Sequence, residues 1–248
     1  GMTFVLGYSS CDVDLLDTTP SSSISSANVW ESPILARAAV MGVYNELYEK
    51  FSKNCTGQTL GIPYDAFSSV MDMNWKNSCF VISGSCTPST SAVSTHYKFY
   101  YTIIYRANDV INNIDNVPEM DDEEKAKLKA ECKFLRAWAY FYLNVLWKGV
   151  PIYTENVPNS EATKARSSES EVWNLIISDL TDCINEVNLP NKYAKGNSDH
   201  GHITKGAAYA LRGQVYQFLE DYTKALADFE AIEPMGYSLY SPSDGEKG

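Results

Sequence analysis

The stretch TKGAAYALRGQVYQFLEDYTKALADF, residues 204–229, decides the fold. Apolar residues recur at helical spacing on both sides of a tight Glu220-Asp221 turn, with Leu211, Val215 and Phe218 before it and Tyr222, Leu226 and Phe229 after it. Thr204 starts the first of the two segments. The stretch therefore predicts a pair of short helices joined by a tight turn.

Small and aromatic residues also hold fixed positions in this pair. Gly213, Tyr216, Ala225 and Phe229 are spaced 3, 9 and 4 residues apart, and Tyr209 precedes them. A small residue on each helix lets the two backbones approach, while the aromatic side chains fill the gaps beside them. The spacing resembles one tetratricopeptide (TPR) unit, with Tyr209 where that motif has its Trp, and implies TPR-like stacking of helical hairpins.

Helical periodicity also runs through the preceding part of the chain. The apolar stripes are Val40, Tyr44, Leu47, Tyr48 and Phe51, then Tyr97, Tyr101, Ile104, Ile111 and Ile114, then Leu128, Cys132, Leu135, Ala139, Tyr142 and Leu146, and finally Trp173, Ile176, Leu180, Cys183 and Val187. No segment of comparable length alternates like a strand. The sequence predicts an all-α fold of TPR-like stacked helical hairpins.

Local signals mark where these helices begin and end. Ser32-Pro33 is a favourable start, and Asp121 with Glu124, like Ser168 with Glu171, has the spacing of a capping box. Gly149 and Pro151 end the third helix, and Pro190 ends the fourth.

Composition excludes several classes of function. The 248 residues include 31 Asp and Glu against 20 Lys and Arg, a net charge of −11, so the surface repels phosphate backbones and nucleic acid is not expected as a partner. Only three His are present, which disfavours histidine-based catalysis. Asp199-His200-Gly201-His202 lacks a third ligand at helical spacing, so no metal and no cofactor are expected. The surrounding loop, 188–203, is polar and is interpreted as plain surface.

The six cysteines contain no Cys-x-x-Cys pair, which argues against zinc fingers and thioredoxin-like chemistry. Cys132 and Cys183 lie on apolar stripes and are predicted to be buried thiols. Cys55, Cys79 and Cys86 share one loop, where an oxidising compartment would allow a local bridge, but three cysteines cannot all pair. Their connectivity stays open.

The segment from Met2 to Cys11 has an apolar patch followed by small residues and a cysteine. It resembles the cleavage site of a bacterial lipoprotein, which would make Cys11 the lipidated residue. The alternative is an irregular N-terminal segment that happens to contain a cysteine. Residues 12–32 are rich in Ser and Thr without a period, and predict an extended arm.

A long irregular loop, 54–92, separates the first two predicted helices. Connections are usually about 4–6 residues, so a loop of this length is either disordered or functional. Its aromatic and aliphatic content favours function. It also contains the run Asp72-Met73-Asn74-Trp75-Lys76-Asn77, where an indole is flanked by amide and carboxylate side chains.

Several segments in order resemble the SusD/RagB family of cell-surface glycan-binding lipoproteins. They are Cys11 followed by Leu16-Asp17-Thr18-Thr19-Pro20, then Tyr101, Ile104, Arg106-Ala107-Asn108 and Ile111, then Phe134-Leu135-Arg136-Ala137, Tyr140 and Gly149-Val150-Pro151, and finally residues 201–208 and Asp221-Tyr222-Thr223-Lys224-Ala225. The resemblance spans about residues 11–240. Family members are longer, and the part that resembles them here is their N-terminal, TPR-bearing half.

The resemblance implies a non-catalytic protein that holds polysaccharide at the outer membrane of a Gram-negative bacterium and works with a TonB-dependent (SusC-like) transporter in nutrient uptake. Aromatic faces cover sugar rings, and amides and carboxylates bond their hydroxyls. We therefore expect Trp75 to be the stacking platform, with Tyr64 as a second face and Asp72, Asn74 and Asn77 as hydroxyl partners. The alternative for Trp75 is a loop anchor packed on the helices.

Arg136 and Asn108 invite a functional interpretation, but both lie within helical stripes and are expected to satisfy buried backbone or carboxylate groups. The expected organisation is a lipoprotein arm (1–32), a SusD-like helical domain (33–240) that carries loop 54–92, and a tail (241–248) where the family's second half would follow.

Two alternative functions remain. A TPR-like protein-interaction scaffold would have a buried Trp75. A glycoside hydrolase needs two carboxylates about 5–10 Å apart across a cleft. Asp65 and Asp72 are the only loop pair available for it, and nothing in the sequence raises the pKa of either.

Overall fold

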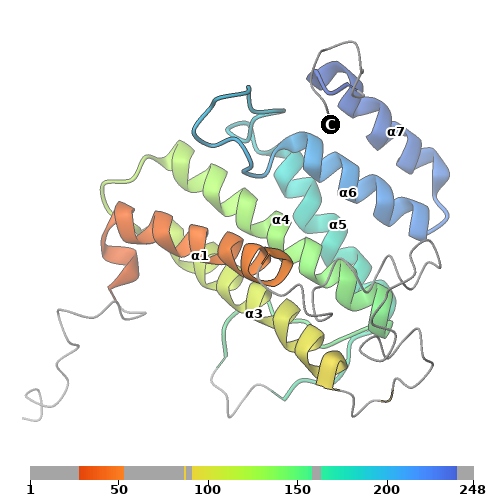
Figure 1. Cartoon of the computed structure of the whole chain (residues 1–248). Helices are drawn as coiled ribbons and strands as arrows, with labels where there is room; N and C mark the ends of the chain where they lie inside the picture. Colours follow the sequence, from red (N-terminus) through yellow and green to blue (C-terminus); the bar gives the residue numbers. More distant parts are fainter. Residues whose placement is uncertain (1–27, 53–86, 88–90, 158–162, 239–248) are drawn as a thin grey trace, which may run out of the picture.

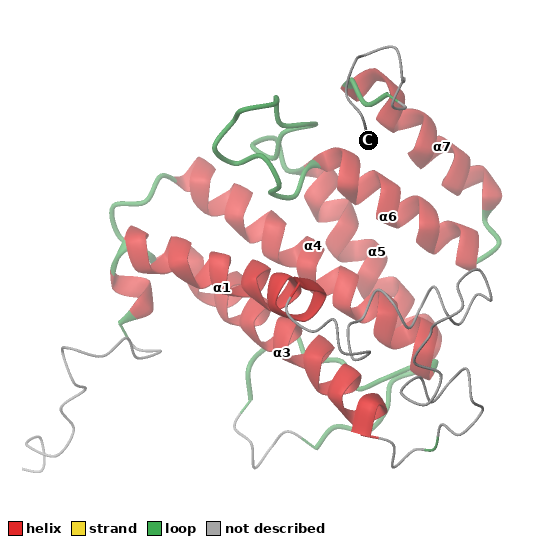
Figure 2. Cartoon of the chain, in the orientation of Figure 1, coloured by secondary structure: helices red, strands yellow, loops and turns green. Residues whose placement is uncertain are grey.

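Figure 1 shows the computed structural model of the chain, which describes residues 28–52, 87, 91–157 and 163–238. The α-helices of this part are α1 (Pro33–Ser52), α3 (Ser91–Asn113), α4 (Asp122–Trp147), α5 (Glu169–Asn185), α6 (Lys205–Phe218) and α7 (Tyr222–Ile232). Short 3-10 helices occupy Val29–Glu31, Ile114–Asn116 and Glu233–Met235. The described part contains no strand (Figure 2), so the all-α prediction is confirmed. None of its helices is both long and apolar enough to cross a membrane.

Helices that follow one another in the chain lie side by side and form a row of hairpins (Figure 1). α4 packs against α3 and α5, α5 packs against α6, and α6 packs against α7. α1 lies on α3 and also contacts α4. The connections between α3 and α4 and between α6 and α7 are short, which makes the two helices of each pair antiparallel. This is the predicted TPR-like arrangement.

The central position of α4 explains its composition. From Phe134 to Asn144, only Trp138 and Tyr142 keep partial exposure, because neighbouring helices cover α4 on more than one side. A helix that is apolar nearly all round is stable only when it is covered in this way.

The C-terminal end of α4 follows the predicted stop signal. Lys148 adopts the left-handed conformation and donates its N–H to the Asn144 carbonyl. Gly149 follows with φ 90°, and a Cβ on it would lie 2.5 Å from the Ser167 carbonyl oxygen. Only glycine fits a site with both constraints. The chain therefore leaves α4 sharply and runs back along α3.

The capping box predicted for Asp121 and Glu124 is wrong. Asp121 is the N-cap of α4, but its side chain accepts no hydrogen bond from the first turn. The Glu124 carboxylate instead accepts two hydrogen bonds from the Arg37 guanidinium of α1, both of 2.6 Å. By contrast, Ser168 and Glu171 form the predicted capping box at the start of α5.

Close approach of α6 and α7 has the predicted steric origin. A Cβ added to Gly213 would lie 2.5 Å from Cε1 of Phe229, and Ala225 is buried. The absence of a side chain on α6 therefore makes room for an aromatic ring of α7.

Several residues assigned to apolar stripes lie at the surface instead, namely Tyr48, Leu146, Val187, Phe218, Tyr222 and Leu226. Val187 follows the end of α5 and does not belong to that helix. Phe218 and Leu226 lie on the last hairpin of the row. Periodicity identifies an apolar face, but it does not say whether another helix covers that face.

The two cysteines within the described residues behave as predicted. Cys132 and Cys183 are buried free thiols in the α4 and α5 packing. The Cys183 thiol donates to the Ala130 carbonyl over 3.0 Å. Burial raises the pKa of both thiols, so both stay protonated and unreactive.

Candidate ligand-binding site

The binding residues predicted from the sequence lie outside the described residues. They are Tyr64, Asp72, Asn74, Trp75 and Asn77, together with the proposed lipidation site Cys11. Their roles therefore stay predictions. The described residues offer several concave surfaces, two of which differ clearly in chemistry.

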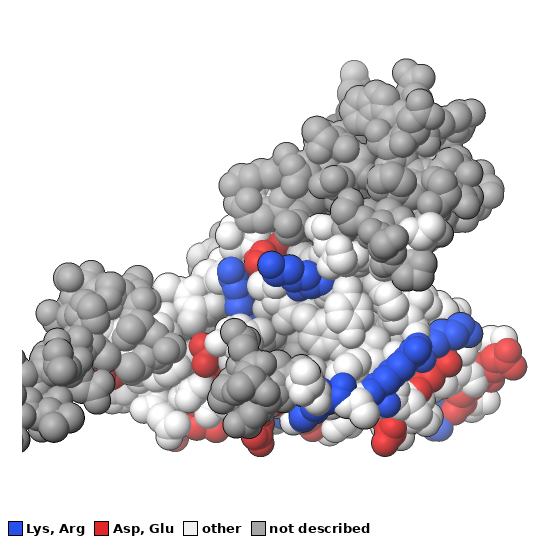
Figure 3. All heavy atoms as spheres, turned by 90° about the horizontal axis from the view of Figure 1, so that it is seen from below, with Lys and Arg blue, Asp and Glu red and all other residues white. Residues whose placement is uncertain are grey.

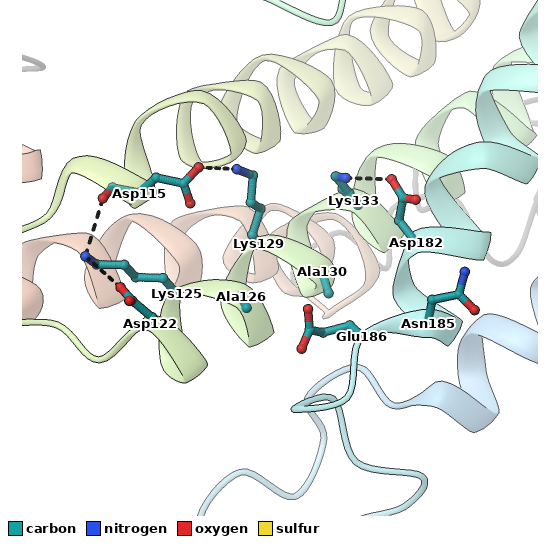
Figure 4. A pocket seen from close by; sticks show the side chains of 10 residues that line it. All are labelled: Asp115, Asp122, Lys125, Ala126, Lys129, Ala130, Lys133, Asp182, Asn185 and Glu186. Atoms are coloured by element: carbon teal, nitrogen blue, oxygen red, sulfur yellow. Dashed lines mark hydrogen bonds and ion pairs between the residues drawn. The ribbon is translucent and has the colours of Figure 1, made fainter.

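The first is a charged hollow of about 560 Å³ along α4 and α5 (Figure 4). Lysines on successive turns of α4 line it, and each meets a carboxylate: Lys125 with Asp122, Lys129 with Asp115, and Lys133 with Asp182. Glu186 also lines it and accepts hydrogen bonds from Asn188. Each of the three lysines is matched by a carboxylate, and no aromatic ring lines the hollow. The hollow is a salt-bridged surface, and it suits neither an anion nor a sugar ring.

The second lies along α3, where the segment that follows α4 runs back over the helix. We call residues 151–157 the strap. Side chains of α3 and α4 hold its backbone: Tyr101 Oη donates to the Pro151 carbonyl (2.7 Å), Asn108 Nδ2 to the Tyr153 carbonyl (2.9 Å), Asn112 Nδ2 to the Thr154 carbonyl (3.2 Å), and the Tyr153 N–H donates to Tyr140 Oη (2.7 Å). These bonds fix the path of the strap.

A buried polar chain supports this arrangement from below. The Arg136 guanidinium donates two hydrogen bonds to the Asp179 carboxylate, of 2.8 and 2.7 Å, and a third to Asn108 Oδ1, of 2.8 Å. Burial raises the pKa of Asp179, and Arg136 opposes that shift. Because Asn108 in turn holds the Tyr153 carbonyl, the chain runs from α5 through α4 and α3 to the strap. The structural roles predicted for Arg136 and Asn108 are confirmed.

We call the concave surface between α3 and the strap the α3 groove. It consists of two hollows, of about 160 and about 380 Å³, which share Glu155 and Asn156. The smaller has an aromatic lining that includes Tyr101, Tyr105 and Tyr153. The larger has a polar lining of Asp109, Asn112 and Asn113 beside the two shared residues. An aromatic end next to an amide and carboxylate end can hold a ligand that has both apolar faces and hydroxyl groups.

Sequence reasoning missed this groove. Helical spacing places Ile104 on the apolar stripe and Tyr105 off it, as the structure has them, but it does not reveal that the strap lies beside Tyr105 and forms a groove there. The sequence signal that could have indicated the groove is the polar pair Glu155-Asn156, shortly after Pro151.

The 188–203 loop is not the plain surface that the sequence predicted. His202 Nδ1 lies 2.9 Å from Oε2 of Glu131, which is fully buried on α4. Tyr44 Oη donates to the same oxygen over 2.7 Å and accepts the Ile203 N–H over 3.0 Å. Burial raises the pKa of Glu131. The loop is therefore anchored to α1 and α4 by a buried carboxyl group.

Charged side chains on the described surface are interspersed. Seen from below, basic and acidic side chains lie next to one another, with uncharged areas between them (Figure 3). On this face the basic side chains form a diagonal row at the lower right of the view, and acidic side chains lie beside that row (Figure 3).

The fold and the α3 groove together define a helical-hairpin protein with a surface suited to a neutral, hydroxyl-rich ligand. Residues 14–217 match the model of the SusD-like family described as starch-binding and associating with the outer membrane. The chain belongs to this family.

Relatives in sequence agree with this assignment. SusD-like protein P38 of Formosa agariphila is 28% identical over 222 residues, which cover 87% of this chain and 41% of the relative. A SusD-like protein of Bacteroides ovatus is 27% identical over 220 residues, which cover 86% of this chain and 38% of the relative. The chain thus spans less than half the length of these relatives.

Solved structures share the fold. A SusD superfamily protein of Bacteroides thetaiotaomicron has a TM-score of 0.73 at 19% identity, with 86% of this chain and 50% of that one covered. A laminarin-binding SusD-like protein has a TM-score of 0.70 at 23% identity, with 85% of this chain and 47% of that one covered. At these identities the likeness establishes the stacked-hairpin architecture.

Proposed function

We propose that this chain binds polysaccharide at the outer surface of a Gram-negative bacterium, without cleaving it. In this proposal it is held at the outer membrane by a lipid on Cys11 and passes its glycan to a TonB-dependent (SusC-like) transporter for uptake. The observation that carries the proposal is the family match over residues 14–217, which includes the whole of loop 54–92. Within that loop, Trp75 and Tyr64 are the proposed ring platforms, and Asp72, Asn74 and Asn77 are the proposed hydroxyl partners.

Affinity electrophoresis tests the proposal. The chain is run through native gels that each contain one polysaccharide, with laminarin first because a structural neighbour binds it. Retardation without released product is the expected result, and Trp75→Ala should remove most of it. Tyr222→Ala is the matched control, since Tyr222 is 67% exposed on α7 and belongs to no proposed glycan site. Cleavage of a polysaccharide, or equal retardation of the Trp75→Ala variant, would contradict the proposal.

A protein-interaction scaffold is the second candidate. The observation that favours it is the run of exposed apolar side chains at the last hairpin, Phe218, Leu219, Tyr222 and Leu226. Clustered exposed apolar residues mark interaction surfaces more often than isolated ones do. A chain that is retarded by no polysaccharide would favour this second function over the first.

A further inference from the structure

We infer that the α3 groove is a second carbohydrate subsite, in which a sugar ring lies on Tyr105 and its hydroxyls bond to polar groups of α3 and the strap. The inference rests on the proposed function, because it assigns a further contact to a glycan-binding protein. It concerns residues separate from those of loop 54–92.

Tyr105 is the ring in this groove whose face is available. Its side chain is 57% exposed, although the preceding Ile104 is fully buried. Tyr101 and Tyr153 pack edge to face, with ring centres 6.0 Å apart, and the Lys164 ammonium lies 5.0 Å from the Tyr153 ring centre. Tyr105 has no ring contact, hydrogen bond or ion pair with any described residue. An aromatic face left open inside a hollow is the surface that the C–H face of a pyranose covers.

Polar groups with free bonding capacity lie next to this ring. Asn112 and Asn113 use their Nδ2 groups to hold the Thr154 and Asp109 carbonyls, which leaves their amide oxygens as acceptors. The Glu155 and Asn156 side chains bond to no described residue. Burial raises the pKa of the Asp109 carboxyl group, which is consistent with partial removal from water. The groove thus offers the acceptors and donors that vicinal hydroxyls require.

The groove is preformed, which reduces the entropy lost on binding. Bonds from α3 and α4 hold the strap, and the Asp179–Arg136–Asn108 chain supports them. No lysine or arginine lines either hollow, whereas Asp109 and Glu155 do, so the lining disfavours a phosphate. The charged hollow on α4 and α5 has no aromatic ring, and its three lysines already pair with carboxylates.

Heteronuclear NMR on the full chain tests the inference. Glucose hexasaccharides of several linkages, including laminarihexaose, are titrated to about 10 mM, enough to saturate a site with a Kd near 1 mM. For at least one of them, the backbone amides of residues 105–113 and 153–157 should shift as a group. Tyr105→Ala should weaken that binding by about fivefold, the effect of losing roughly 1 kcal/mol of ring contact. Tyr222→Ala should leave it unchanged.

The result separates this inference from the proposed function. If the amides of the groove do not move with any hexasaccharide, or move equally in the Tyr105→Ala variant, the subsite is refuted, even when Trp75-dependent retardation occurs. If the amides shift and Tyr105→Ala weakens the binding, the subsite stands even when Trp75→Ala does not reduce retardation. In that case only the binding role proposed for Trp75 in loop 54–92 would be rejected.

Discussion

Gly213→Ala and Gly42→Ala add the same methyl group within two helices, yet the structure predicts opposite effects. The heavy atom nearest to a Cβ on Gly42 is Nη1 of Arg106, at 4.0 Å, so α1 gains only the better helix propensity of alanine, about 1 kcal/mol. A Cβ on Gly213 would lie 2.5, 2.8 and 2.9 Å from three ring carbons of Phe229. Carbon atoms in proteins ordinarily approach to about 3.5–4.0 Å. Phe229 must therefore move, or α7 must shift away from α6.

Overpacking of this kind costs about 1–3 kcal/mol. Both variants gain the same helix propensity from alanine, so this gain cancels when they are compared. Gly213→Ala should therefore be less stable than Gly42→Ala by about 1–3 kcal/mol. Urea unfolding followed by circular dichroism measures this difference, provided that the two m-values agree. Phe229→Leu in the Gly213→Ala background should recover part of the loss. Equal midpoints for the two alanine variants would refute the steric account of the α6–α7 contact.

Three further predictions concern buried polar groups and thiols. Asp179→Asn leaves the Arg136 charge buried without its partner and should lower the free energy of unfolding, measured in urea, by about 3 kcal/mol. Asp182→Asn is the control, because Asp182 lies one turn away with a half-exposed side chain, and it should cost less than about 1 kcal/mol in the same assay. The pKa of Glu131 is raised above its ordinary 4.5, so the folded state holds that proton more tightly and loses stability as the pH rises through the window above 4.5. Glu131→Gln should lack this decrease when melting temperatures are compared across pH, and parallel curves would contradict the assignment. Cys183 should react with a thiol reagent only after urea is added, and rapid labelling of the native protein would disprove its burial.

The fold could be predicted because its signals are local. Periodicity, the glycine at 149 and the Ser168 capping box each depend on residues within one or two turns, and the structure confirms all three. The capping box at Asp121 was wrong because Glu124 bonds to Arg37, which lies 87 residues away in the chain. A local rule cannot anticipate a distant competitor for the same side chain.

The same limit applies to the 188–203 loop. Its Gly, Asn and Asp content is typical of a solvated surface, and most of it is exposed. The contact that contradicts this interpretation joins His202 to Glu131, 71 residues earlier, inside the packing of α1 and α4. Nothing in the loop's own composition marks one of its two histidines as an anchor.

The residues that carry the family resemblance specify the frame, by which we mean the strap held against α3, and they do not specify the ligand. Asn108, Arg136 and Gly149 are each buried, and each is required by a hydrogen bond or a backbone conformation that holds the strap against α3. Tyr105 and Glu155, which face the groove, contribute nothing to that frame, because neither bonds to a described residue. The frame would therefore tolerate other side chains at both positions. The class of protein could thus be predicted from the sequence, while the identity of the proposed glycan depends on side chains that this frame does not specify. Binding measurements on variants at 75 and 105 test which of those side chains contribute.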